Sequence, residues 1–255
     1  MAETILQFNH GIAKTKPNSF RRQIACPFCN RESLTDILDT KGPMIWLKNK
    51  YPVLKDAFQT VLIETDKCDS ELSEYALPYL TELLHFAVEK WLALEVSGRY
   101  QSVLFFKNHG PLSGGSIRHP HMQIVGLENV DYRDRLREEY FDGTLIDASR
   151  DVVFNLSTRP MIGFTEFNVV MSDDGQLEQA AEYIHITSHY ILNHFNNKGC
   201  NSYNLFFYHW KNRILTKIVP RYPTTPLFIG YGLRQVATNA ESVIDDIKKL
   251  YFNES

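Results

Sequence analysis

The residues best suited to chemistry lie in one short stretch that holds His119, His121 and Gln123. In an extended strand, alternate positions share a face, so these three side chains would point the same way. A run of small residues, Gly-Gly-Ser at 114–116, comes just before them. A loop built from such residues leaves its backbone N–H groups open to an anion. Two imidazoles and an amide beside this loop predict a site that handles phosphate.

A second group of reactive side chains begins with Cys26 and Cys29, which form a C-x2-C turn. This spacing lets two thiolates reach one tetrahedral metal ion. Redox motifs share the spacing, but nothing in the chain predicts the thioredoxin-like strand that precedes them. Cys68 and His119 stand at ends of elements that can meet this turn, although Cys68 is equally consistent with a buried, unreactive thiol. We interpret Cys200 as a free thiol.

The composition of the chain is that of a soluble globular protein, with 44% hydrophobic and 22% charged residues among 255. A net charge of -3 argues against a nucleic-acid partner recognised through bulk positive charge. No apolar run reaches the roughly 18 residues of a membrane span, and residues 1–10 lack the apolar centre of a signal peptide. We therefore expect a cytoplasmic protein that binds neither membrane nor nucleic acid.

A weak internal repeat with an offset of about 101 residues organises the chain. Each copy is expected to contain a strand, a helix and two further strands, at 61–63, 72–92, 104–106 and 121–127 in the first copy and at 167–171, 177–195, 205–207 and 213–219 in the second. The tripeptide Leu-Phe-Phe occurs at the same place in both. This order predicts an α+β fold of antiparallel strands and packed helices. The last strand of the second copy has no histidine, so we expect chemistry in the first copy.

These elements divide the chain into three expected parts. Residues 1–130 hold the cysteine turn and the first copy, and residues 131–160 form a charged connector with some helix. Residues 161–255 hold the second copy and a C-terminal helix from about Asn239 to Phe252.

Five motifs occur in order along the chain: CPFC at 26–29, NKYP at 49–52, KNHG at 107–110, GGSIRHPHMQ at 114–123 and FIGY at 228–231. In these motifs the chain resembles galactose-1-phosphate uridylyltransferases, the nucleotidyl-transferring branch of the histidine-triad superfamily. The resemblance implies tandem histidine-triad-like repeats, the second one degenerate, in agreement with the internal repeat. It also implies a homodimer and a role in carbohydrate metabolism.

The resemblance implies one zinc ion with a mainly structural role. The zinc ligands of the family fall on Cys26, Cys29, Cys68 and His119. The family more often has histidine at the position of Cys68, and thiolate for imidazole is a conservative exchange at zinc. Ile218 and Pro220 stand near the family's second metal-binding pair, so we expect no second metal.

The resemblance also implies catalytic roles. The nucleophile falls on His121, whose neutral imidazole would attack the α-phosphorus of a nucleoside diphosphate sugar and expel the sugar phosphate. The nucleotidyl group then passes from the histidine to a second phosphate-bearing acceptor. Gln123 stands where hydrolase relatives have a third histidine, and its amide can donate a hydrogen bond but cannot shuttle a proton. Ser116 would stabilise charge on the transferring group.

Further positions match substrate contacts of the family. The nucleoside pocket falls on Asn49, Tyr51 and Val61, the phosphate contacts fall on Asn108, Gly115 and Lys16, and one sugar-phosphate contact falls on Tyr231. Two other sugar-phosphate positions differ from the family, because Pro226 and Gly232 replace a lysine and a glutamate. The nucleotide half of the pocket therefore matches the family and the sugar half departs from it.

The residues leave three alternatives to nucleotidyl transfer between sugar phosphates. With inorganic phosphate or water as the acceptor, the same site would be a nucleotide-sugar phosphorylase or a hydrolase. The altered sugar half favours a zinc-containing nucleotide binder without catalysis, whereas the presence of both His121 and Gln123 argues against it. A zinc module for DNA or RNA is disfavoured by the acidic balance and by the lack of a basic, aromatic strip.

Overall fold

The chain folds into two compact units, each built of antiparallel strands and helices, and the predicted α+β class is confirmed. The structure is a computed structural model that describes residues 5–20 and 25–252. The outer ends of the expected domains, at 1–4 and 253–255, lie outside the described residues. The first unit comprises Met1–Glu71 and Glu82–Arg135, and the second comprises Leu72–Thr81 and Leu136–Ser255.

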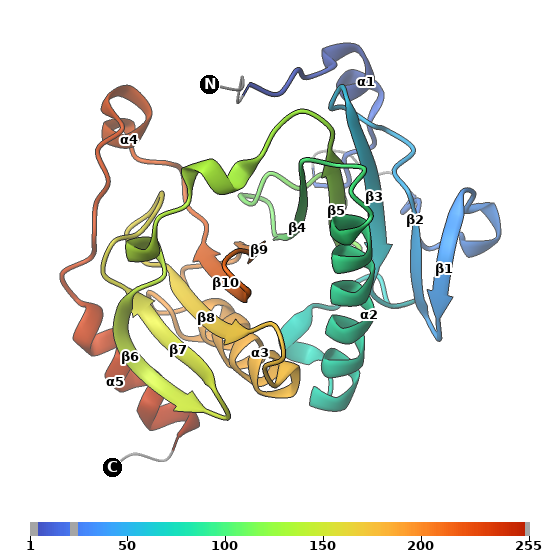
Figure 1. Cartoon of the computed structure of the whole chain (residues 1–255). Coiled ribbons are helices and arrows are strands. Elements are labelled where there is room, and N and C mark those ends of the chain that lie inside the picture. The colour runs from blue at the N-terminus through green and yellow to red at the C-terminus, as the bar shows by residue number, and fades with distance from the viewer. Residues whose placement is uncertain (1–4, 21–24, 253–255) are drawn as a thin grey trace. The chain divides into compact units, whose positions relative to one another are not determined.

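In the first unit, five strands follow one another in the order β1-β2-β3-β5-β4 (Figure 1). They are β1 (Ile37–Lys41), β2 (Met44–Lys48), β3 (Ala57–Ile63), β4 (Ser102–His109) and β5 (His121–Leu127). The strands β3, β4 and β5 confirm predicted elements, whereas β1 and β2 were not predicted. Two short helical elements precede β1, α1 (His10–Thr15) and the 3-10 helix η1 (Arg31–Ser33).

The long helix α2 (Leu77–Val96) begins later than the sequence predicts. Leu72, where the predicted helix starts, lies instead in a 3-10 turn, Leu72–Glu74. The physical reason is Pro78, which lacks an N–H and whose ring obstructs a preceding helical turn, so it is tolerated only in the first turn of a helix. Farther along α2, Trp91 is fully buried and its indole N–H donates to the carbonyl of Val103 at 2.8 Å. This bond fixes α2 against β4.

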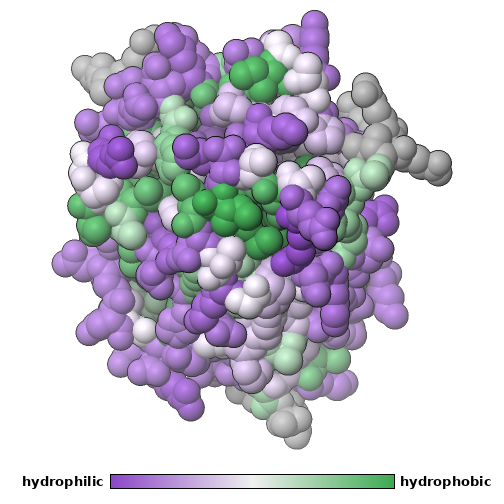
Figure 2. All heavy atoms as spheres, turned by 90° about the vertical axis from the view of Figure 1, so that its right-hand side faces the viewer, coloured by the Kyte–Doolittle hydropathy of each residue, from purple (hydrophilic) through white to green (hydrophobic). Residues whose placement is uncertain are grey.

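The outer strand β1 is tied to α2 by ion pairs. Asp39 pairs with Lys90 at 2.6 Å, and Lys41 pairs with Glu82 at 3.1 Å. On the side of the first unit where β1 and β2 lie, Figure 2 shows apolar side chains among hydrophilic ones, and Ile37 is an exposed apolar residue of β1. Charged residues on an edge strand oppose pairing with the edges of other molecules.

The second unit repeats the order of the first, with strand, helix and two strands. These are β8 (Phe167–Ser172), α3 (Leu177–Asn193), β9 (Tyr203–His209) and β10 (Arg213–Pro220), and all four match predicted elements. Its strand order is β9-β10-β8-β7-β6. The chain continues through a short helix α4 (Pro226–Tyr231) and ends in α5 (Ala240–Tyr251), which confirms the predicted C-terminal helix.

The segment between the two copies differs from the expected connector. Its helical part consists of two 3-10 turns, η3 (Tyr132–Arg135) and η4 (Glu138–Tyr140). The strands β6 (Gly143–Ser149) and β7 (Val152–Ser157) make up most of the rest. In β7, Val152 and Phe154 are fully buried while Val153 between them is partly exposed. The next three residues, Asn155, Leu156 and Ser157, are buried as well, so β7 is a largely buried strand in a segment whose charged residues suggested helix.

Strand register shows why the second copy is degenerate. Phe106 of the first Leu-Phe-Phe tripeptide pairs with Gln123, and Phe207 of the second pairs with Thr216. Thr216 therefore takes the place of Gln123, and Ile214, two positions earlier, takes the place of His121. The second copy thus lacks the imidazole and the amide. Among the described residues, no helix has the length and apolar composition to cross a membrane.

The packing of β5 yields a test of this register. A Cβ atom at Gly126 would lie 2.6 Å from the ring of Tyr100, which stacks on Phe58. We expect Gly126→Ala to lower the free energy of unfolding by about 1–3 kcal/mol, because the ring must leave its stacked position. Gly163→Ala is the control, since a Cβ there meets no atom within 4 Å. Equal denaturant midpoints for the two variants would contradict the register.

Candidate active site and metal centre

Four side chains of the first unit form a cluster of metal-ligand type. One ligand atom each from Cys26, Cys29, Cys68 and His119 lies within 4.8 Å of the others. The sulfurs of Cys26 and Cys29 are each 3.6 Å from Nδ1 of His119. Tetrahedral zinc, with Zn–S near 2.3 Å and Zn–N near 2.0 Å, places sulfur and nitrogen about 3.6 Å apart. The donor set and its spacing therefore fit a four-coordinate structural zinc ion.

The imidazole of His119 is oriented by a hydrogen bond on its far side. Its Nε2 lies 2.8 Å from the carbonyl oxygen of Thr65. A carbonyl oxygen only accepts, so Nε2 carries the proton and Nδ1 offers its lone pair to the cysteines. Such an outer hydrogen bond is what fixes the tautomer of metal-binding histidines. His119 itself is fully buried.

Two thiols of the cluster have raised pKa values, and burial is the main cause in each. Burial, and then the hydrogen bonds from Cys29 and Cys26, raise the pKa of the Cys68 thiol to about 12. Burial also raises the pKa of Cys29. A divalent cation supplies the positive charge that stabilises three thiolates in one place. Without such a cation, the protein groups of the cluster do not compensate the negative charge of three thiolates.

His121 is the first residue of β5 and is 8% exposed. Its Nδ1 lies 2.8 Å from the carbonyl oxygen of His119 and must donate to it. The lone pair of the imidazole is therefore on Nε2. Burial, followed by the charges of Lys107 and Lys16, lowers the pKa of His121 to about 4. The side chain is neutral near pH 7.

His119 does not share a strand with His121, which corrects the expectation that three side chains of one strand point the same way. The strand starts at His121, and His119 lies before it in a bend. Between them Pro120, which has no N–H to give to a ladder, accepts a hydrogen bond from the backbone N–H of Glu64 at 3.1 Å. The bend directs His119 to the cysteines, whereas the side chains of His121 and Gln123 both point into a cavity.

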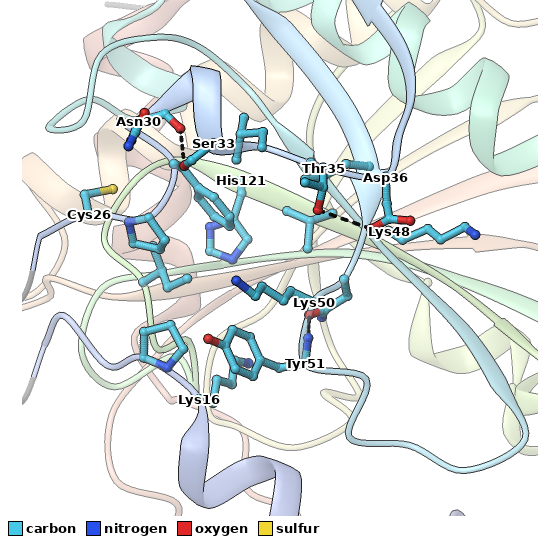
Figure 3. A pocket seen from close by; sticks show the side chains of 18 of the residues that line it. Lys16, Cys26, Asn30, Ser33, Thr35, Asp36, Lys48, Lys50, Tyr51 and His121 are labelled. Atoms are coloured by element: carbon cyan, nitrogen blue, oxygen red, sulfur yellow. Dashed lines mark hydrogen bonds between the residues drawn. The ribbon is translucent and has the colours of Figure 1, made fainter.

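A cavity of about 360 Å³ opens in front of His121 (Figure 3). Seven of the predicted catalytic and substrate-binding residues line it: Lys16, Asn49, Tyr51, Val61, Ser116, His121 and Gln123. The register explains part of this grouping, because Val61 pairs with Gln123 across β3 and β5. Cys26 also lines the cavity, so the metal-ligand cluster and the cavity share a wall.

The remaining predicted positions lie elsewhere. Asn108 and Gly115 adjoin each other, since a Cβ at Gly115 would lie 3.2 Å from Cβ of Asn108, and Gly115 precedes Ser116 in the chain. Tyr231 is the last residue of α4 in the second unit and is 77% exposed.

Several lining residues were not predicted. They are Phe28, Ser33, Leu34, Thr35, Asp36, Lys48 and Lys50, among others. The ring centre of Phe28 lies 5.4 Å from that of His121 and 5.9 Å from that of His119, so this ring packs against both histidines. Its place inside the CPFC motif was the available signal. The turn before β1 has no apolar periodicity, so the sequence held no comparable signal for Ser33 to Asp36.

The charge on the cavity wall favours an anion. Among the described residues, Lys16, Lys48 and Lys50 line it together with one carboxylate, that of Asp36. Lys16 is half-buried, and burial lowers its pKa. Asn49 adds a structural role, because its side-chain oxygen accepts the backbone N–H of Tyr51 at 2.9 Å and shapes the turn at the cavity edge (Figure 3). A neutral imidazole on a positive wall suits a phosphate-bearing ligand.

Residues 8–130 match the family described as "Domain of unknown function (DUF4931) N-terminal domain", and residues 133–252 match the corresponding C-terminal domain. The chain belongs to the DUF4931 family. A DUF4931 family protein from Bacillus cereus ATCC 10987 is 46% identical, with 86% of this chain and 100% of that chain covered and a TM-score of 0.78. No curated protein sequence matches this chain.

Two more distant structures share the fold of this DUF4931 protein. A uridylyltransferase matches at 18% identity and a TM-score of 0.68, over 89% of this chain and 91% of that chain. An ADP-glucose phosphorylase from Arabidopsis thaliana with bound ADP-glucose matches at 17% identity and a TM-score of 0.68, over 93% of this chain and 94% of that chain. The predicted resemblance to galactose-1-phosphate uridylyltransferases is thereby confirmed as a likeness of fold.

The metal-ligand cluster makes a direct prediction. Cys26→Ser should weaken zinc binding by at least about 100-fold, since it removes a ligand where loss of an outer hydrogen bond alone costs 10- to 100-fold. Competition with a chromogenic chelator measures this affinity, and the thermal unfolding midpoint should fall with it. Cys200→Ser is the matched control, because this thiol lies outside the cluster. An unchanged zinc affinity in Cys26→Ser would show that the cluster is not the zinc site.

Proposed function

We propose that this DUF4931 protein is a zinc-containing nucleotidyltransferase that acts on a nucleoside diphosphate sugar through His121. The observation that carries the proposal is the orientation of this imidazole. Its Nδ1–H donates to the carbonyl of His119, which leaves the Nε2 lone pair on a residue that lines a positively charged cavity. A buried neutral imidazole with one nitrogen occupied and the other basic is the form that attacks phosphorus.

In the first half-reaction, Nε2 of His121 forms a bond to the α-phosphorus and the bond from that phosphorus to the bridging oxygen breaks. The sugar phosphate leaves, and the nucleotidyl group stays on the histidine. In the second half-reaction, a phosphate oxygen of the acceptor attacks the same phosphorus, and the imidazole leaves neutral again. The carbonyl of His119 stabilises the positive charge that the ring carries in between.

The other lining residues support this sequence by position. Gln123 and Ser116 donate hydrogen bonds to the transferring phosphoryl group, and Lys16 supplies charge. Asn108 adjoins Gly115, the residue before Ser116, and both would contact the phosphates. Asn49, Tyr51 and Val61, which also line the cavity, hold the nucleoside. Because the amide of Gln123 cannot deliver a proton to or from water, the intermediate persists until an acceptor binds.

The zinc ion proposed for the cluster has a structural part in this function. Cys26, Cys29, Cys68 and His119 would hold it, and with four protein ligands the site has no open position for substrate. Bound there, zinc supplies the charge that keeps the three thiols together as thiolates. The cysteine turn then keeps Phe28 against the ring of His121.

Phosphorolysis is the second candidate function. The ADP-glucose phosphorylase has the same TM-score as the uridylyltransferase, 0.68, so the likeness of fold favours neither acceptor. The lysines of the cavity wall would also serve inorganic phosphate. Release of a nucleoside diphosphate on adding phosphate identifies a phosphorylase, and release of a monophosphate in water identifies a hydrolase.

The covalent intermediate provides the decisive test. Incubation with UDP-, ADP- and GDP-sugars should add one nucleotidyl mass to the intact protein for at least one base, and His121→Ala should show no adduct. His85→Ala, a substitution of an exposed histidine on α2, should keep the adduct. Intact-protein mass spectrometry measures all three. If no base gives an adduct, the double-displacement mechanism is wrong.

We also propose that the protein is a homodimer. Residues 227–236 expose five apolar side chains, Leu227, Ile229, Tyr231, Leu233 and Val236. Exposed apolar groups in such number mark an interaction site. Ile229→Lys combined with Leu233→Lys should convert a dimer to a monomer of 29.6 kDa in light scattering. Val96→Lys, an equally exposed apolar position on α2, should leave the dimer intact, and a monomeric unmodified protein would contradict the proposal.

A further inference from the structure

A buried ion pair lies behind the strand that carries His121, and the proposed reaction makes no use of it. Lys107 donates to the carboxylate of Glu64, and their side chains are 1% and 0% exposed. Removing two charges from water costs several kcal/mol per ion, and apolar side chains of similar size often give equal or greater stability. Stability alone therefore does not account for this pair.

The register places the pair at the level of the histidine. Lys107 in β4 pairs directly with Met122, and Ile63 in β3 pairs directly with His121. Directly paired residues point to one face and successive residues to opposite faces, so Lys107 lies on the face turned away from the cavity. Glu64 follows Ile63. The ion pair thus connects the two strands that flank β5, next to its first residue.

The backbone beside Glu64 holds both histidines. The N–H of Glu64 donates to the carbonyl of Pro120 at 3.1 Å, and the carbonyl of Thr65 accepts from Nε2 of His119 at 2.8 Å. The carbonyl of His119 in turn accepts from Nδ1 of His121. Residues 64–65 therefore orient His119 directly and His121 through it. What fixes residues 64–65 fixes both rings.

We infer that Glu64 and Lys107 are positioning residues, whose ion pair anchors residues 64–65 so that His119 faces the cysteines and His121 faces the cavity. The part that concerns His121 rests on the proposed function, whereas the part that concerns His119 stands on the metal-ligand cluster alone. Neither residue lines the cavity, so each orients the two rings through the backbone it holds, while the charge of Lys107 also contributes to the lowered pKa of His121.

The second unit offers a matched control. Lys217 and Glu166 form another ion pair, at 2.8 Å, with side chains that are 1% and 0% exposed. Lys217 also donates to the carbonyl of Tyr140, and Glu166 accepts the backbone N–H groups of Met161 and Ile162. None of these contacts involves the metal-ligand cluster or a residue that lines the cavity. The two ion pairs match in chemistry and burial. They differ in the backbone segments that they contact.

The experiment compares two double variants of the full chain, Glu64→Gln with Lys107→Met and Glu166→Gln with Lys217→Met. Both lose a buried ion pair, so chemical denaturation of the two measures what that loss alone does to stability. Only the first should weaken zinc binding, by about 10- to 100-fold as for other outer contacts of metal-binding histidines. Only the first should alter the visible absorption of the cobalt-substituted protein, which reports the geometry of the metal ligands. Only the first should also slow the formation of the nucleotidyl adduct at saturating nucleotide.

The outcomes separate the two proposals. Wild-type metal affinity and cobalt spectrum in a folded Glu64→Gln, Lys107→Met variant would overturn the inference, as would an equal change in the control variant. Weakened metal binding with an unchanged rate of adduct formation would overturn the part about His121. If the unmodified protein forms no adduct, the proposed function fails while the metal readouts still decide the inference. If the first variant does not fold, Glu64→Leu with Lys107→Met, which leaves neither buried group charged, takes its place with the same criteria.

Discussion

The arrangement of this site depends on the polar groups of one buried residue, His119. Its Nε2–H donates to Thr65, its Nδ1 faces the sulfurs of Cys26 and Cys29, and its carbonyl accepts from His121. One residue thereby joins the end of β3, the cysteine turn and the start of β5. Because each bond is made inside the protein, where a lost partner is costly, displacement of any of the three parts affects the other two.

The second copy keeps the packing of the first copy without its histidine and glutamine. The second copy retains the strand order and the register of the first, but Ile214 and Thr216 stand where the first copy has His121 and Gln123. An apolar residue in place of a buried imidazole needs no hydrogen-bond partner, so the exchange is compatible with the fold. The asymmetry concentrates the positive cavity and the metal-ligand cluster in the first unit.

The elements with strong periodicity were predictable. Both long helices and the strands on either side of them follow from apolar residues at helical or alternating spacing. The strands β1 and β6 were missed because they are rich in exposed or charged positions, so no buried stripe shows in the sequence. The strands β2 and β7 are mostly buried, and they were missed although each contains a short apolar run. The start of α2 was wrong because periodicity continues through Leu72, whereas Pro78 excludes a helical turn there.

The sequence by itself determined which side chains are available and in what order: the CPFC turn, the His-x-His-x-Gln spacing and the glycine-rich loop are local features. Only the tertiary structure decided that Cys68 joins His119, which nitrogen of His121 is free, and that Glu64 pairs with Lys107. Each of these contacts joins residues on different elements or depends on a backbone bend at Pro120. Strand order and register determine such contacts, and they are properties of the whole packed unit rather than of any local pattern.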